Sequence, residues 1–246
     1  MQLAQPQTMT GLVLPQRNRL LATLDADVRA RLLPSLELVT LPLGKVLYES
    51  DALPRYVYFP VDSIISLLYV MESGASAEIA VIGNEGLLGL AVFMGGRSTT
   101  NRAVVQSAGS AYRISGQLIK AEFDRHEKLS DLLLRYTQVL ITQMAQTAVC
   151  NRHHRIEQQL CRWLLISLDR LPDNKLSMTQ ELIGNMLGVR REGITDAASK
   201  LQRLDVIEYQ RGQITVLDRT RLEAMSCECY RVVKDETDRL LANLQD

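Results

Sequence analysis

The sequence predicts an α+β protein in three successive parts: an antiparallel β-roll of the jelly-roll type, a long helix and a C-terminal winged helix-turn-helix. Three observations lead to this prediction. Residues 36–115 alternate short β-rich runs with turn signals, and residues 117–150 contain neither glycine nor proline. Residues 179–202 place small and apolar residues where two crossing helices need them. The 246 residues suffice for two domains.

Composition is that of an ordinary globular protein. Hydrophobic residues make up 46% of the chain, charged residues make up 23%, and the net charge is +0. Because basic residues are not in excess, any surface for a polyanion must be local. The N-terminus lacks a basic segment followed by an apolar run, and no apolar stretch reaches the roughly 18 residues of a membrane helix. We therefore expect a cytoplasmic protein without a membrane segment.

The first domain is predicted at residues 17–116, after an N-terminal tail at residues 1–16. A helical pattern over residues 17–33 opens this domain. Short runs rich in β-branched and aromatic residues follow, and turn signals such as "PLG", "ESGAS" and "IGNEG" separate them. Many short strands at nearly regular spacing are typical of an antiparallel barrel or sandwich, which predicts the β-roll.

Residues 117–151 form the predicted dimerisation helix. Apolar residues recur in it at helical spacing, and a second apolar stripe runs through Leu132, Val139 and Ile141. One small β-domain cannot cover two stripes, so we expect one face to cover the β-roll and the other to meet a second copy of the chain. The predicted dimerisation residues are Leu129, Leu133, Tyr136, Leu140, Met144 and Ala148.

Residues 152–217 form the predicted DNA-binding domain, and a C-terminal helix is expected within residues 218–246. Gly184 leaves room for a second helix to cross the first, and Gly188 stands at the turn, where a positive φ is often needed. A hairpin through Arg211 and Gly212 follows as a wing. The apolar inner faces of the two helices are predicted at Leu182, Ile183, Met186, Leu187, Ile194, Ala197, Ala198 and Leu201.

The outer face of the second helix carries the predicted contacts to DNA. Arginine can donate two hydrogen bonds to guanine, and glutamate can accept one from cytosine. Arg190, Lys200 and Arg211 suit phosphates, and Thr179 is both a helix N-cap and a possible phosphate donor. The alternative is that the Arg-Glu pair at the start of this helix is merely solvated. The predicted DNA-binding residues are Thr179, Gln180, Arg190, Arg191, Glu192, Thr195, Lys200 and Arg211.

With these motifs in this order, the chain resembles the Crp/Fnr transcription regulators over about residues 20–217. In that family the recognition helix typically begins with Arg-Glu-Thr-Val and carries a second arginine in the next turn. Arg191 and Glu192 match this pattern, Gly193 and Ile194 stand at the Thr-Val places, and Asp196 stands at the second arginine. The resemblance implies a homodimer that binds a two-fold-symmetric operator in double-stranded DNA. Because Asp196 repels phosphate and cannot donate a hydrogen bond to a base edge, the operator should differ from the family's best-known target.

The resemblance also implies an effector pocket in the β-roll. Relatives that bind cyclic nucleotides carry Gly-Glu-Leu-Gly-Leu followed by Arg-Ser, with the glutamate on the ribose and the arginine on the phosphate. Here "GLLGL" at 86–90 puts a leucine at the glutamate position, where it accepts no hydrogen bond. We therefore expect another effector, or none, rather than cyclic AMP. The candidate pocket residues are Glu85, Gly86, Leu87, Gly89, Arg97, Ser98 and Arg102.

The cysteines and histidines predict no metal site and no cofactor. Iron–sulfur members of the family use an N-terminal cysteine cluster, and the first cysteine here is Cys150. Cys227 and Cys229 lack the spacing of zinc or redox motifs. The adjacent His153 and His154 diverge on a helix and cannot share a metal. We expect reduced and mostly buried thiols.

The sequence is compatible with three functional hypotheses. The sequence favours a homodimeric DNA-binding transcription regulator whose β-roll senses a small molecule, with RNA polymerase as a further candidate partner. The alternatives are a regulator that needs no ligand and an adaptor whose helix-turn-helix packs on protein. We expect no enzyme, because the sequence has no GxSxG or HExxH motif and no glycine-rich phosphate loop.

Overall fold

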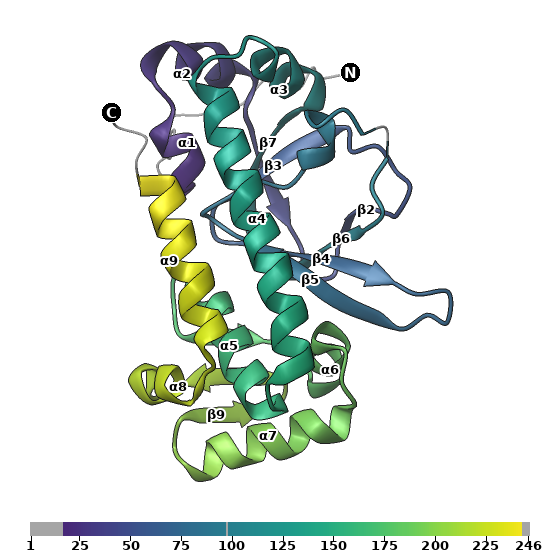
Figure 1. Cartoon of the computed structure of the whole chain (residues 1–246), viewed down its shortest axis with the longest axis vertical. Coiled ribbons are helices and arrows are strands. Elements are labelled where there is room, and N and C mark those ends of the chain that lie inside the picture. The colour runs from purple at the N-terminus through teal and green to yellow at the C-terminus, as the bar shows by residue number, and fades with distance from the viewer. Residues whose placement is uncertain (1–16, 97, 243–246) are drawn as a thin grey trace, which may run out of the picture.

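The computed structural model describes residues 17–96 and 98–242. The predicted tail at residues 1–16 and the pocket candidate Arg97 lie outside the described residues. Figure 1 shows the β-roll, the long helix α4 beside it and the smaller C-terminal domain below them. The predicted fold class and order of parts are confirmed.

The β-roll consists of two antiparallel sheets. One sheet has the strand order β1-β7-β3, and the other has the order β2-β6-β4-β5. The strands are β1 Glu37–Leu41, β2 Val46–Tyr48, β3 Tyr56–Pro60, β4 Ile64–Val70, β5 Ser76–Ile82, β6 Arg102–Ser107 and β7 Gly109–Ser115.

Strand β4 connects the two hydrophobic cores of the molecule. Side chains alternate between the two faces of a strand. Ile65 and Leu67 lie in the core of the β-roll, whereas Ile64 and Leu68 lie in the core of the C-terminal domain. This explains why β4 carries apolar residues on both of its faces rather than on one.

Two short helices, α1 Arg19–Thr23 and α2 Ala26–Leu32, precede the sheets, where the sequence predicted one helix. A new helix begins after Leu24 because the Asp25 side chain accepts a hydrogen bond from the Val28 amide at 2.9 Å. A 3₁₀ turn at Leu33–Ser35 then leads into β1, and a second at Leu90–Val92 follows β5.

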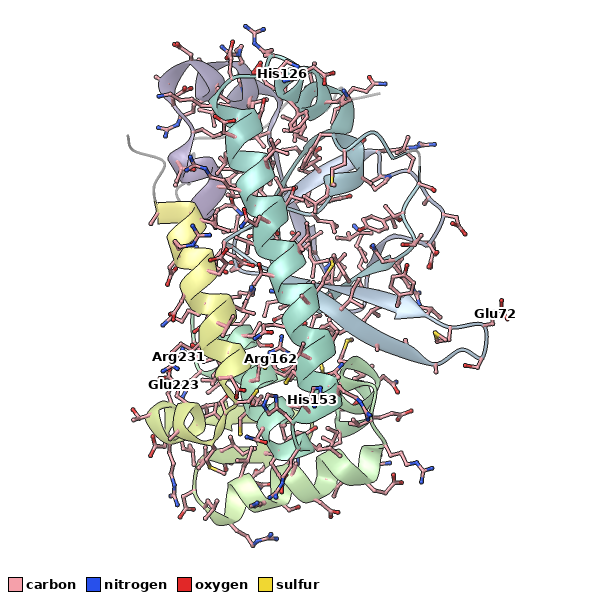
Figure 2. All side chains as sticks on the ribbon, viewed as in Figure 1. Glu72, His126, His153, Arg162, Glu223 and Arg231 are labelled. Carbon is pink, nitrogen blue, oxygen red and sulfur yellow. The ribbon has the colours of Figure 1, made fainter. Side chains whose placement is uncertain are left out.

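The predicted helix over residues 117–151 is divided in the structure. Helix α3 spans Gly116–Phe123 and helix α4 spans Lys128–His153, so the expectation of one uninterrupted helix is wrong. The chain reverses between them, where His126 adopts a φ of 56°. Figure 2 shows His126 and His153 at opposite ends of α4.

The predicted dimerisation stripe faces the chain's own β-roll. Leu129, Leu133, Tyr136 and Leu140 are all at most 3% exposed and belong to the β-roll core, and Met144 packs against that core. The prediction that these five residues meet a second copy is wrong, because the β-roll already covers them. Ala148 is exposed.

The C-terminal domain is a three-helix unit with a small antiparallel sheet of order β8-β10-β9. The large apolar side chains of α5 and the small residues of α7 lie in its core. Its elements are α5 Ile156–Leu168, β8 Lys175–Ser177, α6 Gln180–Leu187, α7 Arg191–Arg203, β9 Ile207–Gln210 and β10 Gln213–Val216.

The end of the chain returns to the β-roll. The single C-terminal helix of the prediction is divided into α8 Arg219–Met225 and α9 Glu228–Ala242, with Cys227 between them. Helix α9 runs beside α4 (Figure 1), and Arg19 of α1 forms a 3.1 Å ion pair with Asp238. The chain thus leaves the β-roll along α4 and returns to it along α9. Within the described residues, no helix has the length and apolarity needed to span a membrane.

Candidate nucleic-acid interface

The first helix of the motif, α6, has a defined beginning and end. At its start, the Thr179 hydroxyl accepts a hydrogen bond from the Leu182 amide at 3.2 Å. At its end, Gly188 adopts a left-handed φ of 66°, which favours glycine. A Cβ on Gly184 would lie 3.0 Å from the Val189 carbonyl oxygen, so this glycine lets the turn fold back closely on α6. The predicted turn chemistry is confirmed.

The second helix, α7, packs closely because its inner residues are small. Ala197 and Ala198 are each 2% exposed, and Ile194 and Leu201 are fully buried. A Cβ on Gly193 would lie 2.7 Å from Ile156 of α5. Gly193 therefore serves the contact between α7 and α5 and does not face the solvent.

A groove of about 390 Å³ lies between the start of α6, the start of α7 and the wing. The structure brings four of the predicted DNA-binding residues together along it: Thr179, Gln180, Arg191 and Arg211. Glu181, Tyr209 and Gly212 complete its lining. The two arginines come from positions 20 residues apart in the chain (191 and 211) but border one concave, solvent-facing surface.

The wing is fixed to the beginning of α6. Arg211 and Gly212 at its tip have φ values of 50° and 79°, as in a two-residue turn of type I′. The Tyr209 hydroxyl donates to the Met178 carbonyl at 2.8 Å, and the Met178 amide donates to the Gly212 carbonyl at 2.7 Å. These bonds hold Arg211 next to the N-terminus of α6, where backbone amides and the helix dipole favour an anion.

Two of the predicted DNA contacts are engaged within the protein. The Thr195 hydroxyl donates to Gln180 at 2.8 Å and so joins α7 to α6. Lys200 forms a 3.1 Å ion pair with Glu157 of α5 and lowers the pKa of that carboxyl. Thr195 and Lys200 thus hold the helices in place, and any contact they make with DNA stays a prediction.

The exposed face of α7 carries charges of both signs. Arg190, Arg191 and Glu192 are exposed as predicted. Asp196 is also exposed, one helical turn after Glu192, so the two carboxylates lie on the same face. A phosphate backbone approaching α7 meets this acidic strip as well as the arginines.

The predicted effector segment is filled by the chain itself. Glu85 forms a 2.8 Å ion pair with Arg170, and both side chains are only 8% exposed. A Cβ on Gly86 would lie 2.1 Å from the Tyr136 hydroxyl, and Leu87 is fully buried in the β-roll core. The prediction that these three residues line a β-roll pocket is therefore wrong.

The other described candidates lie at a turn, at the surface and in an ion pair. Gly89 stands at a turn with a φ of 124°, close to Val57, and Ser98 is exposed. Arg102, which competed for the phosphate-binding role, forms a 3.1 Å ion pair with Glu49.

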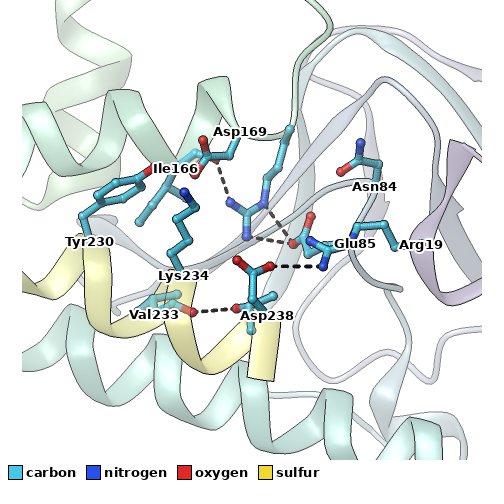
Figure 3. Close-up of a pocket in the computed structure, with 11 residues that line it drawn as sticks. Arg19, Asn84, Glu85, Ile166, Asp169, Tyr230, Val233, Lys234 and Asp238 are labelled. Carbon is cyan, nitrogen blue, oxygen red and sulfur yellow. Dashed lines mark hydrogen bonds and ion pairs between the residues drawn. The ribbon is translucent and has the colours of Figure 1, made fainter. Parts of the chain in front are cut away.

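Glu85 does border a cavity, but at the junction between the domains. Figure 3 shows this cavity of about 210 Å³ between α1, α5 and α9, with the ion pairs Arg19–Asp238 and Arg170–Glu85 drawn across it. The opposite charges on its walls largely compensate each other. Nothing in the sequence placed Glu85 beside α5, because Arg170 comes 85 residues later.

Sequence reasoning also missed a buried polar network beside this junction. Glu78 of β5 accepts hydrogen bonds from Ser66 at 2.5 Å and from the Trp163 indole of α5 at 3.0 Å. The Ser66 hydroxyl also lies 2.7 Å from the side-chain oxygen of Gln106, and the Gln106 amide donates to Ser167 of α5 at 3.2 Å. Burial raises the pKa of Glu78 to about 7 despite these hydrogen bonds. The network joins the β-roll to the DNA-binding domain.

The cysteines are arranged differently from what the sequence predicted. The thiols are buried as predicted, but Cys150, Cys227 and Cys229 meet in one place, together with His154. The thiol of Cys150 lies 3.5 Å from that of Cys227, and the hydrogen bond between them holds the pKa of Cys227 below its usual range. The sequence spacing did not reveal this cluster, because Cys150 and His154 are far in the chain from Cys227 and Cys229.

The comparisons with known proteins agree with this architecture. A family model of the Crp-like helix-turn-helix domain matches residues 158–225. The chain is similar in structure to FixK2 from Bradyrhizobium japonicum, with 17% identity, a TM-score of 0.67, and coverage of 78% of this chain and 98% of that one.

Two further structures share the fold. A CRP-family transcriptional regulator from Thermus thermophilus is 13% identical, with a TM-score of 0.63 and coverage of 76% of this chain and 96% of that one. The c-di-GMP responsive global regulator CLP of Xanthomonas campestris is 13% identical, with a TM-score of 0.59 and coverage of 79% and 100%. No curated protein matches the chain.

Proposed function

We propose that this chain, which carries a Crp-like helix-turn-helix domain at residues 158–225 and has the fold of the Crp/Fnr transcription regulators, binds double-stranded DNA and regulates transcription. The groove between α6, α7 and the wing carries this proposal. It gathers Arg191, Arg211 and the capped N-terminus of α6 on one exposed surface. Phosphates and base edges are ligands of matching chemistry.

The proposed docking follows from this geometry. In helix-turn-helix proteins the second helix enters the major groove, and its first turn contacts the base edges. Arg191 and Glu192 occupy that turn of α7 and are exposed. Arg211 and the N-terminus of α6 then lie where the wing and first helix approach the phosphate backbone. Arg191 would read a guanine, and Arg211 would hold a phosphate.

The proposed homodimer uses a different face of α4 from the one that the sequence suggested. Leu134 and Ile141 are 53% and 60% exposed, and with Ala148 they recur every seven residues along the helix. Gln138 and Ala145 lie between them on the same exposed face. A seven-residue repeat on a 26-residue helix is the pattern of a two-stranded coiled coil. A two-fold dimer of this kind would place two copies of α7 on a symmetric operator.

Binding of an effector by the β-roll stays a prediction. Residues 85–87 argue against cyclic AMP in the family's position, because Leu87 is buried and accepts no hydrogen bond and Tyr136 packs closely against Gly86. This observation favours the second candidate, a regulator whose DNA binding does not depend on a β-roll ligand. Contacts with RNA polymerase stay a prediction.

The decisive experiment selects duplexes from a random pool with the purified protein at near-physiological salt. We expect enrichment of a two-fold-symmetric site whose half-sites are about one helical turn apart. The selection is repeated with a small-molecule cell extract. Enrichment without extract supports the ligand-independent regulator, and enrichment only with extract supports a sensor. Failure to enrich any site in either condition would contradict DNA reading and favour the protein-interaction adaptor.

A further inference from the structure

Four side chains of metal-ligand type converge where α4 ends and α9 begins. Cys150 lies in the last turn of α4, and His154 is the C-cap residue of that helix. Cys227 precedes α9, and Cys229 lies in its first turn. One ligand atom of each residue lies within 4.8 Å of those of the other three. Segments far apart in the chain thus place three sulfurs and one imidazole around a single point.

Two of the ligand-to-ligand distances match those of a tetrahedral zinc site, and the others lie within 4.8 Å. The Cys150 and Cys227 sulfurs are 3.5 Å apart, and the Cys229 sulfur is 3.5 Å from Nδ1 of His154. Zinc binds sulfur at about 2.3 Å and nitrogen at about 2.0 Å, so ligand atoms at tetrahedral corners are about 3.5–3.8 Å apart. Iron–sulfur clusters need more widely spaced cysteines, because each cysteine binds a different corner of the cluster.

Packing alone gives a poor account of this cluster. Cys150, Cys227 and Cys229 are at most 5% exposed and form a cluster separate from the two apolar cores. The fourth cysteine, Cys161, shows the ordinary arrangement, because it lies among the leucines of α5 in the second core. Three thiols gathered around one imidazole form the donor set of a structural zinc site.

The residues around the cluster orient the ligands. The second ring nitrogen of His154, Nε2, lies 3.3 Å from a carboxylate oxygen of Glu228. Metal-bound histidines usually donate their other N–H to such a carboxylate, which fixes the tautomer. The Gln159 amide donates to the His154 carbonyl at 2.9 Å and contacts the Cys150 carbonyl at 3.5 Å. These contacts hold the end of α4 in the geometry that points both ligands at the cluster.

We propose that Cys150, His154, Cys227 and Cys229 bind one Zn²⁺ ion, which fastens the start of α9 to the connection between α4 and α5. Cys150 and Cys227 are 77 positions apart. The chain between them contains α5, the helix-turn-helix, the wing and α8. The metal therefore closes the loop that holds the DNA-binding domain, joining its entry and exit at one point. A bound ion would add to the contacts that the packing of α9 against α4 already makes.

The test measures metal in the full-length protein, purified under reducing conditions without chelator. We expect about one zinc per chain by elemental mass spectrometry, because a closed four-ligand site holds a single ion. Cys227→Ser and Cys229→Ser should each lose most of this zinc. Cys161→Ser is the matched control, since it removes the buried cysteine outside the cluster, and it should keep the full amount. Co²⁺ added to the metal-free protein should give the visible spectrum of a tetrahedral thiolate site.

A conservative variant keeps the proposal testable if the cysteine variants fail to fold. Glu228 is 65% exposed and lies against the outer nitrogen of His154, so Glu228→Gln should fold and bind zinc about 10–100-fold more weakly. Two results would overturn the proposal. One is a metal-free protein that takes up neither Zn²⁺ nor Co²⁺. The other is a Cys150–Cys227 disulfide found by mass spectrometry in a second preparation purified without reductant and without chelator, which would make the cluster a redox cross-link.

Discussion

The DNA-binding domain presents arginines on two different sides. Those on one side join it to the rest of the protein, and those on the other side are free to bind a partner. Toward the β-roll, Arg170 is buried and paired with Glu85, and Arg162 donates to Thr147 at 2.8 Å. Toward the solvent, Arg191 and Arg211 are exposed along the groove. The same residue type thus holds two domains together on one side and is available to a partner on the other. Burial distinguishes them, and the sequence alone does not show it.

The largest expected effect is a loss of stability when the buried Arg170–Glu85 ion pair is broken. Arg170→Ala leaves Glu85 buried without its partner, and breaking a buried ion pair in this way costs about 3–5 kcal/mol of unfolding free energy. Chemical denaturation of the variant and the wild type measures this difference. A loss below about 1 kcal/mol would show that Glu85 is accessible to water and that the two sides differ less than burial suggests.

A second prediction for the buried side concerns how stability depends on pH through Glu78. The pKa of Glu78 is about 7 in the folded protein and about 4.5 in the unfolded chain, so the folded state holds an extra proton between these values. The contribution of Glu78 to the unfolding free energy is therefore present at low pH and is lost as the pH rises through 7. The two pKa values imply a loss of about 3 kcal/mol between pH 4 and 8.

Glu78→Gln mimics the protonated carboxyl, because its amide can donate to Ser66 and its oxygen can accept from Trp163. The variant should be more stable than the wild type at pH 8 and should show a flatter profile in denaturation measured across this range. An unchanged profile would mean that Glu78 does not titrate in the folded protein.

On the outer side, Arg191→Ala should leave stability within about 0.5 kcal/mol of the wild type. It should weaken operator binding by about 2 kcal/mol and relax the preference at one base pair per half-site. Arg211→Ala is the control, because loss of a phosphate contact weakens binding to all sequences equally and lowers the salt slope by about 1. Titrations of operator and random duplexes distinguish the two. Equal weakening on both duplexes by Arg191→Ala would assign it to phosphate as well.

The smallest expected effect is an increase in affinity. Asp196 is exposed on α7 beside the arginines, where its charge repels the phosphate backbone. Asp196→Asn should strengthen binding to any duplex by about 0.5 kcal/mol, and the gain should shrink as salt rises. If affinity instead fell at the operator alone, Asp196 would be accepting a hydrogen bond from a cytosine.

The sequence determined the parts whose constraints are local. Gly184, Gly188 and the alanines of α7 identified the helix-turn-helix, because a tight turn and close helix packing act within about twenty residues. The alternation of short strands and turns identified the β-roll for the same reason. The order of these parts followed directly, and the capped start of α6 at Thr179 was visible from its residue type alone.

The tertiary structure decided which of several similar surfaces is covered. Both stripes of α4 are apolar, and only packing against the β-roll shows that the stripe through Leu133 is internal, that Leu132 and Val139 of the second stripe are buried as well, and that Ile141 is exposed. Likewise, Cys150 and Cys227 have no motif in common, because their 77-position separation closes only when α9 returns along α4. Spacing records contacts within one element, whereas contacts between distant elements depend on how the whole chain packs.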